Sequence, residues 1–151
     1  MAHARESGDE ISRTHIDIGN LTGINNVKGH DAANKDIREI ADIIKRTYEQ
    51  YAPVDKLHFG REGGDEMSVY GLGVSKDTLD KAAQTATMRV RDYARKNGLL
   101  QLMSKRGVPE DVSLHTNTHS INEFLKNNPN ATTQDFLKFN DAKFQKKAEA
   151  Q

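Results

Sequence analysis

The sequence contains no cysteine, and this absence removes two kinds of site at once. Disulfides and thiolate metal centres both need cysteine, so neither can form within this chain. The lack of cysteine also suits a reducing compartment. Because the sequence shows neither a signal peptide nor an apolar run long enough to span a membrane, we expect a cytoplasmic protein without a membrane segment.

The chain also lacks an excess of charge of either sign. Its 22 Lys and Arg residues balance its 22 Asp and Glu residues, so the net charge is zero. A strongly basic surface is the usual footprint of nucleic-acid binding, and we therefore expect no DNA or RNA partner. Hydrophobic residues make up 35% of the 151 residues, and their periodic spacing indicates a folded domain rather than a disordered chain.

The first half of the chain predicts an arm, a strand, a helix and a hairpin. We expect residues 1–13 to form a flexible N-terminal arm and residues 14–151 to form the domain. Alternation predicts a strand at 14–18, with Ile16 and Ile18 on one face and Asp17 on the other. Apolar residues at helical spacing predict a long helix at 31–51, and two extended runs at 56–73 predict a hairpin.

The second half predicts two further helices around a last strand. Helical spacing continues over residues 76–97, and a connector at 99–111 leads to a strand at 112–116. His115 and His119 have a spacing that would bind metal on a helix, but their β-branched surroundings favour a strand, so we expect no zinc site. Ser120 and Glu123 match a capping box that opens a short helix. Thr132 or Thr133 caps a last helix.

This order of elements predicts an α+β fold. Strand, helix, two strands, helix and strand make a ferredoxin-like βαββαβ domain. Its central sheet would be rich in antiparallel pairs, with helices packed on it.

A turn rich in carboxylates lies within the predicted hairpin. Gly63 and Gly64 join the two extended runs, and glycine tolerates the positive φ that a tight hairpin turn requires. Asp65 and Glu66 follow at the tip. Because adjacent carboxylates repel each other, a cation bound there would lower the cost of keeping both charged. Taken alone, these residues also fit an exposed polar turn.

Two motifs give these residues a context. Residues 61–67, Arg-Glu-Gly-Gly-Asp-Glu-Met, resemble the GGDEF signature of diguanylate cyclases, with Met67 in place of the final Phe. Upstream, Asp17 is followed by Asn25-Asn26 and then Gly29-His30, which resembles the family's D-x-D-x-F-K-x-x-N-D-x-x-G-H block. Both motifs occur in the family's order with a helical pattern between them. The chain is thus similar to GGDEF domains, chiefly over residues 15–70.

The resemblance implies a palm-like domain that condenses two GTP molecules to cyclic di-GMP with Mg²⁺ or Mn²⁺. The family's metal ligands fall on the carboxylate of Asp17, the carbonyl of Ile18 and the carboxylate of Asp65. Asp65 would also be the catalytic base, and Glu66 a catalytic group that orients metal or phosphate. Because each domain carries half of an active site, the resemblance implies a homodimer or a tethered second GGDEF domain.

The resemblance also implies substrate contacts. Guanine would meet Asn25 and Asn34, and Gly63 and Gly64 would line the substrate. Asn34 stands where the family has Asp. A neutral amide accepts hydrogen bonds less strongly than a carboxylate but also donates them, so we expect weaker guanine selectivity or a different base.

Three further departures concern charge. Thr22 replaces a family lysine and removes a positive charge where negative charge develops. The late phosphate-binding lysine falls on Ala148, and Lys146 or Lys147 would substitute after a small shift. The inhibitory R-x-x-D would fall on residues 54–57 and is absent, so we expect no product inhibition there.

These departures leave two functions open. One is a diguanylate cyclase, active or weakly active. The other is a degenerate domain that binds a nucleotide or only a protein partner, as a module of a larger protein. A structural domain with an accidental turn would require two spaced motifs to arise by chance. The cyclase interpretation predicts that Asp17 and Asp65 lie close enough to bind one ion.

Overall fold

The computed structural model describes residues 10–140; residues 1–9 and 141–151 lie outside this description. The helices and strands follow in this order: β1 (Ile11–Gly19), α2 (Leu21–Lys28), α3 (His30–Tyr51), the 3₁₀ helix η1 (Val54–Lys56), β2 (Leu57–Arg61), β3 (Glu66–Leu72), α4 (Lys76–Lys96), β4 (Leu102–Met103), β5 (Pro109–Glu110), β6 (Ser113–Ser120) and α5 (Ile121–Asn127). Residues 133–140 are helical as well.

Four of the strands form one sheet in the order β2-β3-β1-β6, and every neighbouring pair is antiparallel. The first strand thus lies at the centre, between β3 and the last strand. This is the order of a ferredoxin-like βαββαβ domain, and it confirms the predicted fold class. A small second sheet pairs β4 with β5.

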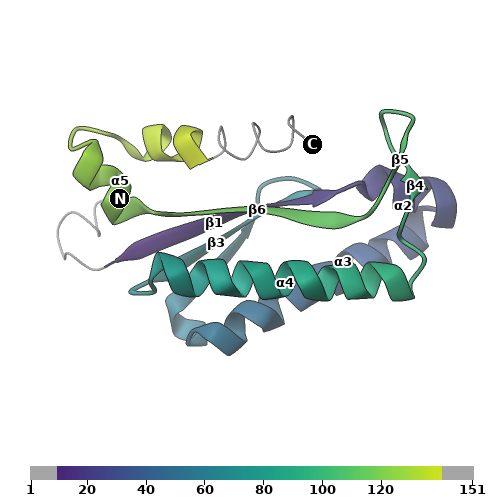
Figure 1. Ribbon diagram of the computed structural model, residues 1–151, viewed down its shortest axis with the longest axis horizontal. Coiled ribbons are helices and arrows are strands. Elements are labelled where there is room, and N and C mark those ends of the chain that lie inside the picture. The colour runs from purple at the N-terminus through teal and green to yellow at the C-terminus, as the bar shows by residue number, and fades with distance from the viewer. Residues whose placement is uncertain (1–9, 141–151) are drawn as a thin grey trace.

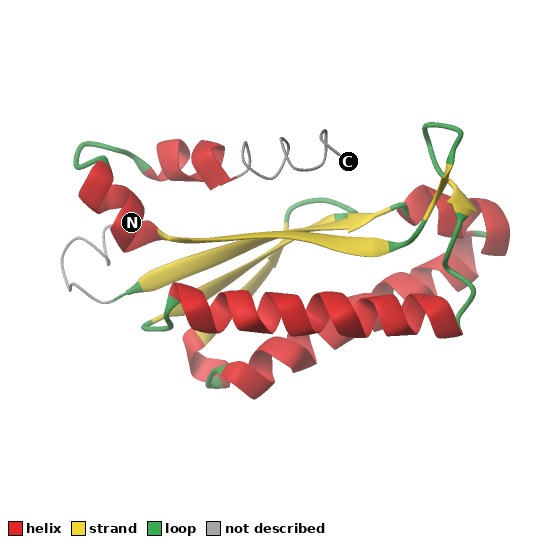
Figure 2. Cartoon of the chain, viewed as in Figure 1, coloured by secondary structure: helices red, strands yellow, loops and turns green. Residues whose placement is uncertain are grey.

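The sheet has helices on both faces (Figures 1 and 2). α3 and α4 lie against one face, while α5 and the helix at 133–140 lie over the other. The face under α3 and α4 carries the main hydrophobic core. The buried residues that the strands contribute include Ile16, Ile18, Val69 and Leu114. In α4 the buried stripe is mostly alanine, and such small side chains let α3 and the sheet approach α4 closely.

Local signals at the helix ends agree with the sequence. The Ser120 hydroxyl accepts a hydrogen bond from the amide of Glu123 at 3.2 Å and so caps α5 as predicted. Thr132 and Asp135 exchange side-chain-to-backbone hydrogen bonds of 2.9 and 3.2 Å, which confirms a cap at Thr132. Within residues 10–140, no helix is long and apolar enough to cross a membrane.

Four expectations need correction. β1 begins at Ile11 rather than residue 14, so residues 11–13 belong to the sheet and not to an arm. β6 runs to Ser120 and includes the second histidine of the pair discussed above. The connector at 99–111 contains the β4–β5 hairpin, and the short helix α2 was not predicted. The reasons lie in contacts between distant parts of the chain, described below.

Candidate functional site

The site is built on the face of β1 that points away from α3 and α4. Alternation along the strand puts Arg13, His15 and Asp17 on this face, while the residues between them enter the main core. In the antiparallel register, Glu66 of β3 lies opposite Asp17, and Asn117 of β6 lies opposite His15. We call the surface formed by these five residues the polar face.

The tip of the β2–β3 hairpin differs from the predicted tight turn. The turn is closed by Glu62, whose amide donates to the carbonyl of Glu66 at 3.0 Å, and by Arg61, whose guanidinium donates to the carbonyl of Gly64 at 2.8 Å. Neither Gly63 nor Gly64 has a positive φ, so the stated reason for the two glycines was wrong. A Cβ at Gly64 would meet nothing within 4 Å. The glycines thus leave the tip open on its outer side.

The hairpin tip lies against the end of β1. The amide of Ile18 donates to the carbonyl of Asp65 at 2.7 Å, one position beyond the pairing of Asp17 with Glu66. The N–H and C=O of a strand residue point toward the same neighbour, so the Ile18 carbonyl also faces the hairpin. The structure therefore brings together Asp17, Ile18, Asp65 and Glu66, as the sequence predicted. Their roles toward metal and substrate stay predictions.

The electrostatics of this corner are unfavourable without a cation. Burial, followed by the nearby charges of Asp65 and Glu66, raises the pKa of Asp17 to about 6. Like charges directly opposite each other in a sheet are destabilising. The Oδ1 atom of Asp17 is also buried without a hydrogen-bond partner among the described residues. A divalent cation fits this corner, because it would supply the missing positive charge and accept oxygen ligands.

The donor set is small. Within residues 10–140 no group of three or more His, Asp or Glu side chains could hold a metal ion. An ion at this corner would therefore rest on two carboxylates together with backbone oxygen, water or substrate. Mg²⁺ is commonly bound in this way, through one or two carboxylates plus substrate phosphates.

A pocket opens beside Asp17 on the side away from the hairpin. Its volume is about 830 Å³, within the range of small-molecule sites. The end of β1, the start of β6, the β4–β5 hairpin and α4 line it, and its basic residues are Arg91, Arg106 and His115. Burial lowers the pKa of His115, which favours its neutral form, and Arg106 is paired with Glu110. This pocket was not predicted from the sequence.

Asn20 builds the wall of that pocket and explains two missed elements. Its side-chain amide donates to the carbonyls of Leu102 and Glu110 at 3.0 and 2.9 Å, which fixes the β4–β5 hairpin beside β1. Its carbonyl oxygen accepts from the amide of Gly23 and caps α2, while its own φ is +65°. A Cβ on Gly23 would come within 2.8 Å of Leu102, so only glycine fits there.

The predicted guanine contacts lie on two packed helices. Asn25 is on α2 and Asn34 is on α3, and both residues are exposed. Neither side chain makes a hydrogen bond within residues 10–140, and neither lines the pocket beside Asp17. Buried Asp36 joins α2, α3 and α4, because Lys28 and Tyr93 contact its two oxygens at 3.0 and 2.6 Å. The structure places the asparagines on neighbouring elements without showing a shared pocket.

The predicted phosphate contact lies at the end of the chain. Lys147, with Lys146 and Ala148, falls outside the described residues. Three other members of the polar face were missed, namely Arg13, His15 and Asn117. The signal for Arg13 and His15 was present, because the alternation that singled out Asp17 continues back to Ile11.

Comparison with known proteins identifies the fold. No family model and no curated protein matches the chain. Solved structures do match. The GGDEF domain of DgcB from Caulobacter crescentus, in complex with c-di-GMP, has a TM-score of 0.73 and 19% identity, covering 99% of this chain and 76% of that chain. The GGDEF domain of FimX from Pseudomonas aeruginosa has a TM-score of 0.69 and 14% identity, covering 99% and 82%.

The active GGEEF domain of a diguanylate cyclase from Vibrio cholerae gives a TM-score of 0.56 and 21% identity, covering 80% of this chain and 67% of that chain. These neighbours define a class. The chain is a palm-like α+β domain with the fold of GGDEF domains. At identities of this size the likeness establishes the fold, and the site residues must carry the argument about activity.

Proposed function

We propose that this domain is a diguanylate cyclase of low turnover, which joins two GTP molecules into cyclic di-GMP with a divalent metal. One observation carries the proposal. Asp17 is half-buried, and its Oδ1 atom is buried without a hydrogen-bond partner among the described residues, opposite Glu66 and next to the hairpin tip that holds Asp65. This cluster of negative charge has the chemistry of a site for a metal-bound nucleotide.

Each residue has a role in this reaction. A bound Mg²⁺ or Mn²⁺ neutralises phosphate charge and makes the attacking hydroxyl more acidic. Asp17, the Ile18 carbonyl and Asp65 would hold it. Asp65 accepts the proton of the 3′-hydroxyl of one GTP. The 3′-oxygen then forms the new bond to the α-phosphorus of the other GTP, and the bond from that phosphorus to pyrophosphate breaks. Glu66, at the same corner, orients the phosphates.

The proposed reaction needs two copies of the site. One domain presents the hydroxyl of its GTP and the other presents the α-phosphate, so two domains must meet at their hairpin tips. A homodimer, or a second GGDEF domain tethered in the same protein, provides this arrangement. The open outer side of Gly64 leaves space for the approach.

Product formation tests the proposal. The protein at high concentration is incubated with GTP and Mn²⁺ or Mg²⁺, and cyclic di-GMP and pyrophosphate are quantified by chromatography and mass spectrometry. We expect product from the wild type and a loss of about 10³-fold in Asp65→Asn, which removes both a ligand and the base. Asp55→Asn is the matched control, because Asp55 is exposed on η1. Equal rates in the wild type and Asp65→Asn would contradict the proposal.

A second candidate function is a degenerate domain that binds nucleotide or a protein partner without turnover. The uncharged Thr22 and Asn34 favour it, because each replaces a charged residue of the family. No product together with intact GTP binding would support this candidate.

Asn34 also provides a test of base selectivity. In Asn34→Asp we expect the affinity for GTP over ATP to rise about 10-fold, because a carboxylate accepts the two guanine N–H groups more strongly than an amide does. Competition binding measures the ratio, and Asn26→Asp on the exposed side of α2 is the control. An unchanged ratio of GTP to ATP affinity would mean that the guanine ring does not contact residue 34.

A further inference from the structure

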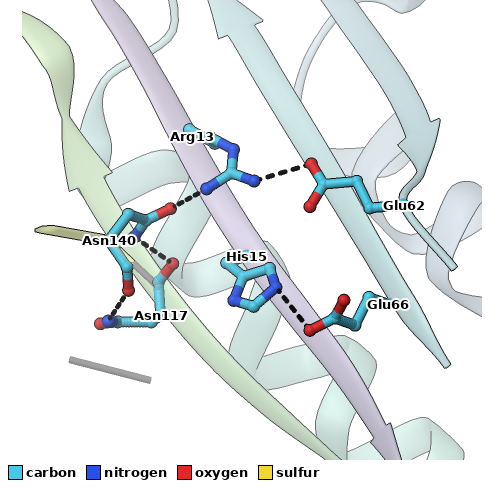
Figure 3. A network of polar contacts seen from close by, with 6 residues as sticks. All are labelled: Arg13, His15, Glu62, Glu66, Asn117 and Asn140. Carbon is cyan, nitrogen blue, oxygen red and sulfur yellow. Dashed lines mark hydrogen bonds and ion pairs between the residues drawn. The ribbon is translucent and has the colours of Figure 1, made fainter. Parts of the chain in front are cut away.

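Arg13 is a buried charge at the centre of the polar face. Its side chain is 1% exposed, although it carries a full positive charge. Figure 3 shows its guanidinium reaching in two directions, toward Glu62 on one side and Asn140 on the other. The guanidinium also lies over the ring of Tyr70, 5.6 Å from its centroid. A buried guanidinium is tolerated only where such partners compensate for lost water.

The contact with Glu62 joins the first strand to the hairpin. The Nη2 atom of Arg13 donates to Oε1 of Glu62 at 2.8 Å. Glu62 is the first residue after β2, at the base of the tip that carries Asp65 and Glu66. The contacts of Arg61 and of the Glu62 amide described above lie within the hairpin and close the turn. They do not hold the tip against β1.

The backbone pairing of Glu66 with Asp17 joins the tip to β1, and a few further contacts add to it. Besides the Arg13–Glu62 pair, these include the Ile18 amide to the Asp65 carbonyl at 2.7 Å and His15 to Glu66 at 3.6 Å. The Arg13–Glu62 pair is the most buried charged contact of this set. Because a buried guanidinium that loses its anionic partner is strongly unfavourable, Arg13 holds Glu62 in place.

The second guanidinium nitrogen of Arg13 contacts the helix at 133–140. This Nη1 atom donates to Oδ1 of Asn140. Asn140 is itself pinned to β6, since its side chain and backbone exchange hydrogen bonds of 3.3 and 3.0 Å with Asn117. Arg13 therefore has a fixed support on the side opposite the hairpin (Figure 3).

We propose that Arg13 is a positioning residue, which seats the hairpin tip on β1 through Glu62 and thereby sets Asp65 and Glu66 relative to Asp17. The helix at 133–140 supports it through Asn140. The effect on metal and substrate rests on the proposed function, whereas the effect on the hairpin does not.

Amide hydrogen exchange tests the positioning directly. In Arg13→Met and in Glu62→Ala, we expect the Ile18 amide to exchange about 10-fold faster, because its bond to Asp65 opens when the tip lifts. The amide of residue 62 should keep its rate, since its bond to Glu66 lies within the hairpin. Arg95→Met is the matched control, because Arg95 is exposed and, within residues 10–140, forms its ion pair with Asp92 on its own helix. It should leave both amides unchanged.

Thermal unfolding separates positioning from stability. Arg13→Met removes the buried charge, and the Glu62 carboxylate that it leaves behind is 36% exposed and can be hydrated, so we expect a modest drop in Tm. Glu62→Ala instead removes the carboxylate that the buried guanidinium contacts at 2.8 Å, and we expect the larger drop in Tm. If both variants speed Ile18 exchange equally while their Tm values differ, global stability does not explain the effect.

Metal binding gives the functional readout. Titration with Mn²⁺ should show about 10-fold weaker binding in Arg13→Met and Glu62→Ala, with no further loss in the double variant. Arg13→Lys should recover part of the affinity, because an ammonium reaches Glu62 but lacks the second arm toward Asn140. In the cyclase assay, kcat should fall with little change in KM for GTP.

The outcomes distinguish the two proposals. Wild-type Ile18 exchange in a folded Glu62→Ala variant would overturn the positioning role of Arg13, whatever the activity. A wild type without Mn²⁺ binding or product would overturn the proposed function, and the exchange data would still decide the role of Arg13. Faster exchange with unchanged Mn²⁺ affinity would restrict Arg13 to a structural role and overturn the proposal.

Discussion

Both faces of β1 bury side chains, but the buried residues differ in chemistry. On one face Thr14, Ile16 and Ile18 are at most 2% exposed under α3 and α4. On the other face Arg13 and His15 are also at most 2% exposed, yet both are ionisable. The same strand therefore supports an apolar core on one side and a charged network on the other.

The apolar face of β1 stabilises the fold, whereas the polar face lowers its stability. Burial of apolar surface stabilises by about 25 cal/mol per Å². Burial of charge stabilises only where each charge is paired, and Asp17 opposite Glu66 is a pair of like charges. Local cost of this kind is typical of functional sites. Three substitutions can break or sharpen the comparison.

Asp17→Asn should give the largest effect, with opposite signs for activity and stability. We expect Mn²⁺ binding and cyclic di-GMP formation to fall about 10³-fold, because a carboxylate ligand is lost. Burial and the neighbouring carboxylates raise the pKa of Asp17 to about 6, so its charged form opposes folding above that pH. In metal-free buffer at pH 7.5, Tm should therefore rise, by about 2–4 °C for each kcal/mol relieved.

Calorimetric unfolding with EDTA and with excess Mn²⁺ measures both changes in one experiment. The wild type should be stabilised by Mn²⁺ and the variant should not. If Mn²⁺ still raises the Tm of Asp17→Asn, the ion binds away from the polar face. The proposed difference between the two faces would then be wrong.

Ile16→Ala should act only on stability. Ile16 is fully buried in the main core, one residue from Asp17. Truncation of such a side chain costs about 2–5 kcal/mol, and Ile16→Val costs about 0.5–1.5 kcal/mol. Denaturant unfolding measures this loss. Well below Tm, Mn²⁺ affinity should stay within about twofold, because the change points away from the ligands. A metal affinity that falls with stability in both variants would show that the two faces are coupled.

Much of the fold could be predicted because its signals are local. Period-two and helical spacing located the strands and long helices, and the Ser120–Glu123 pair located the start of α5. The motif order placed Asp17 near the hairpin tip. The hairpin itself was correct, although its glycines work by leaving the tip open and not by taking a positive φ.

The missed parts depend on contacts between distant residues. Ser12 and Arg13 looked like a polar arm, because the partner that makes Arg13 tolerable inside the protein, Glu62, lies 49 positions away. The cap of α2 similarly depends on Asn20, which is held by carbonyls 82 and 90 positions later. No local pattern encodes such pairs, and the pocket that they frame was therefore invisible in the sequence.

Glu62→Gln should give the smallest effect and one that depends on pH. Burial alone would raise the pKa of Glu62, but hydrogen bonds from Arg13 and Ser68 outweigh it and hold the pKa below its ordinary value of 4.5. A carboxyl whose pKa is lowered on folding stabilises the protein above its unfolded pKa, and this stabilisation is lost as the pH falls through the folded pKa. The wild type should thus exceed the variant in Tm above about pH 5, and the gap should narrow as the pH falls below 4.5 toward the folded pKa.

Thermal unfolding of both proteins in metal-free buffers at pH 7 and pH 3.5 measures the gap. Asp135→Asn is an informative control, because Asp135 also has a lowered pKa but caps a helix away from the hairpin. Its gap should also narrow as the pH falls, without any change in Ile18 exchange. A Glu62→Gln gap as large at pH 3.5 as at pH 7 would mean that Glu62 acts through packing rather than charge, and the ion pair with Arg13 would then not be what holds the hairpin to the polar face.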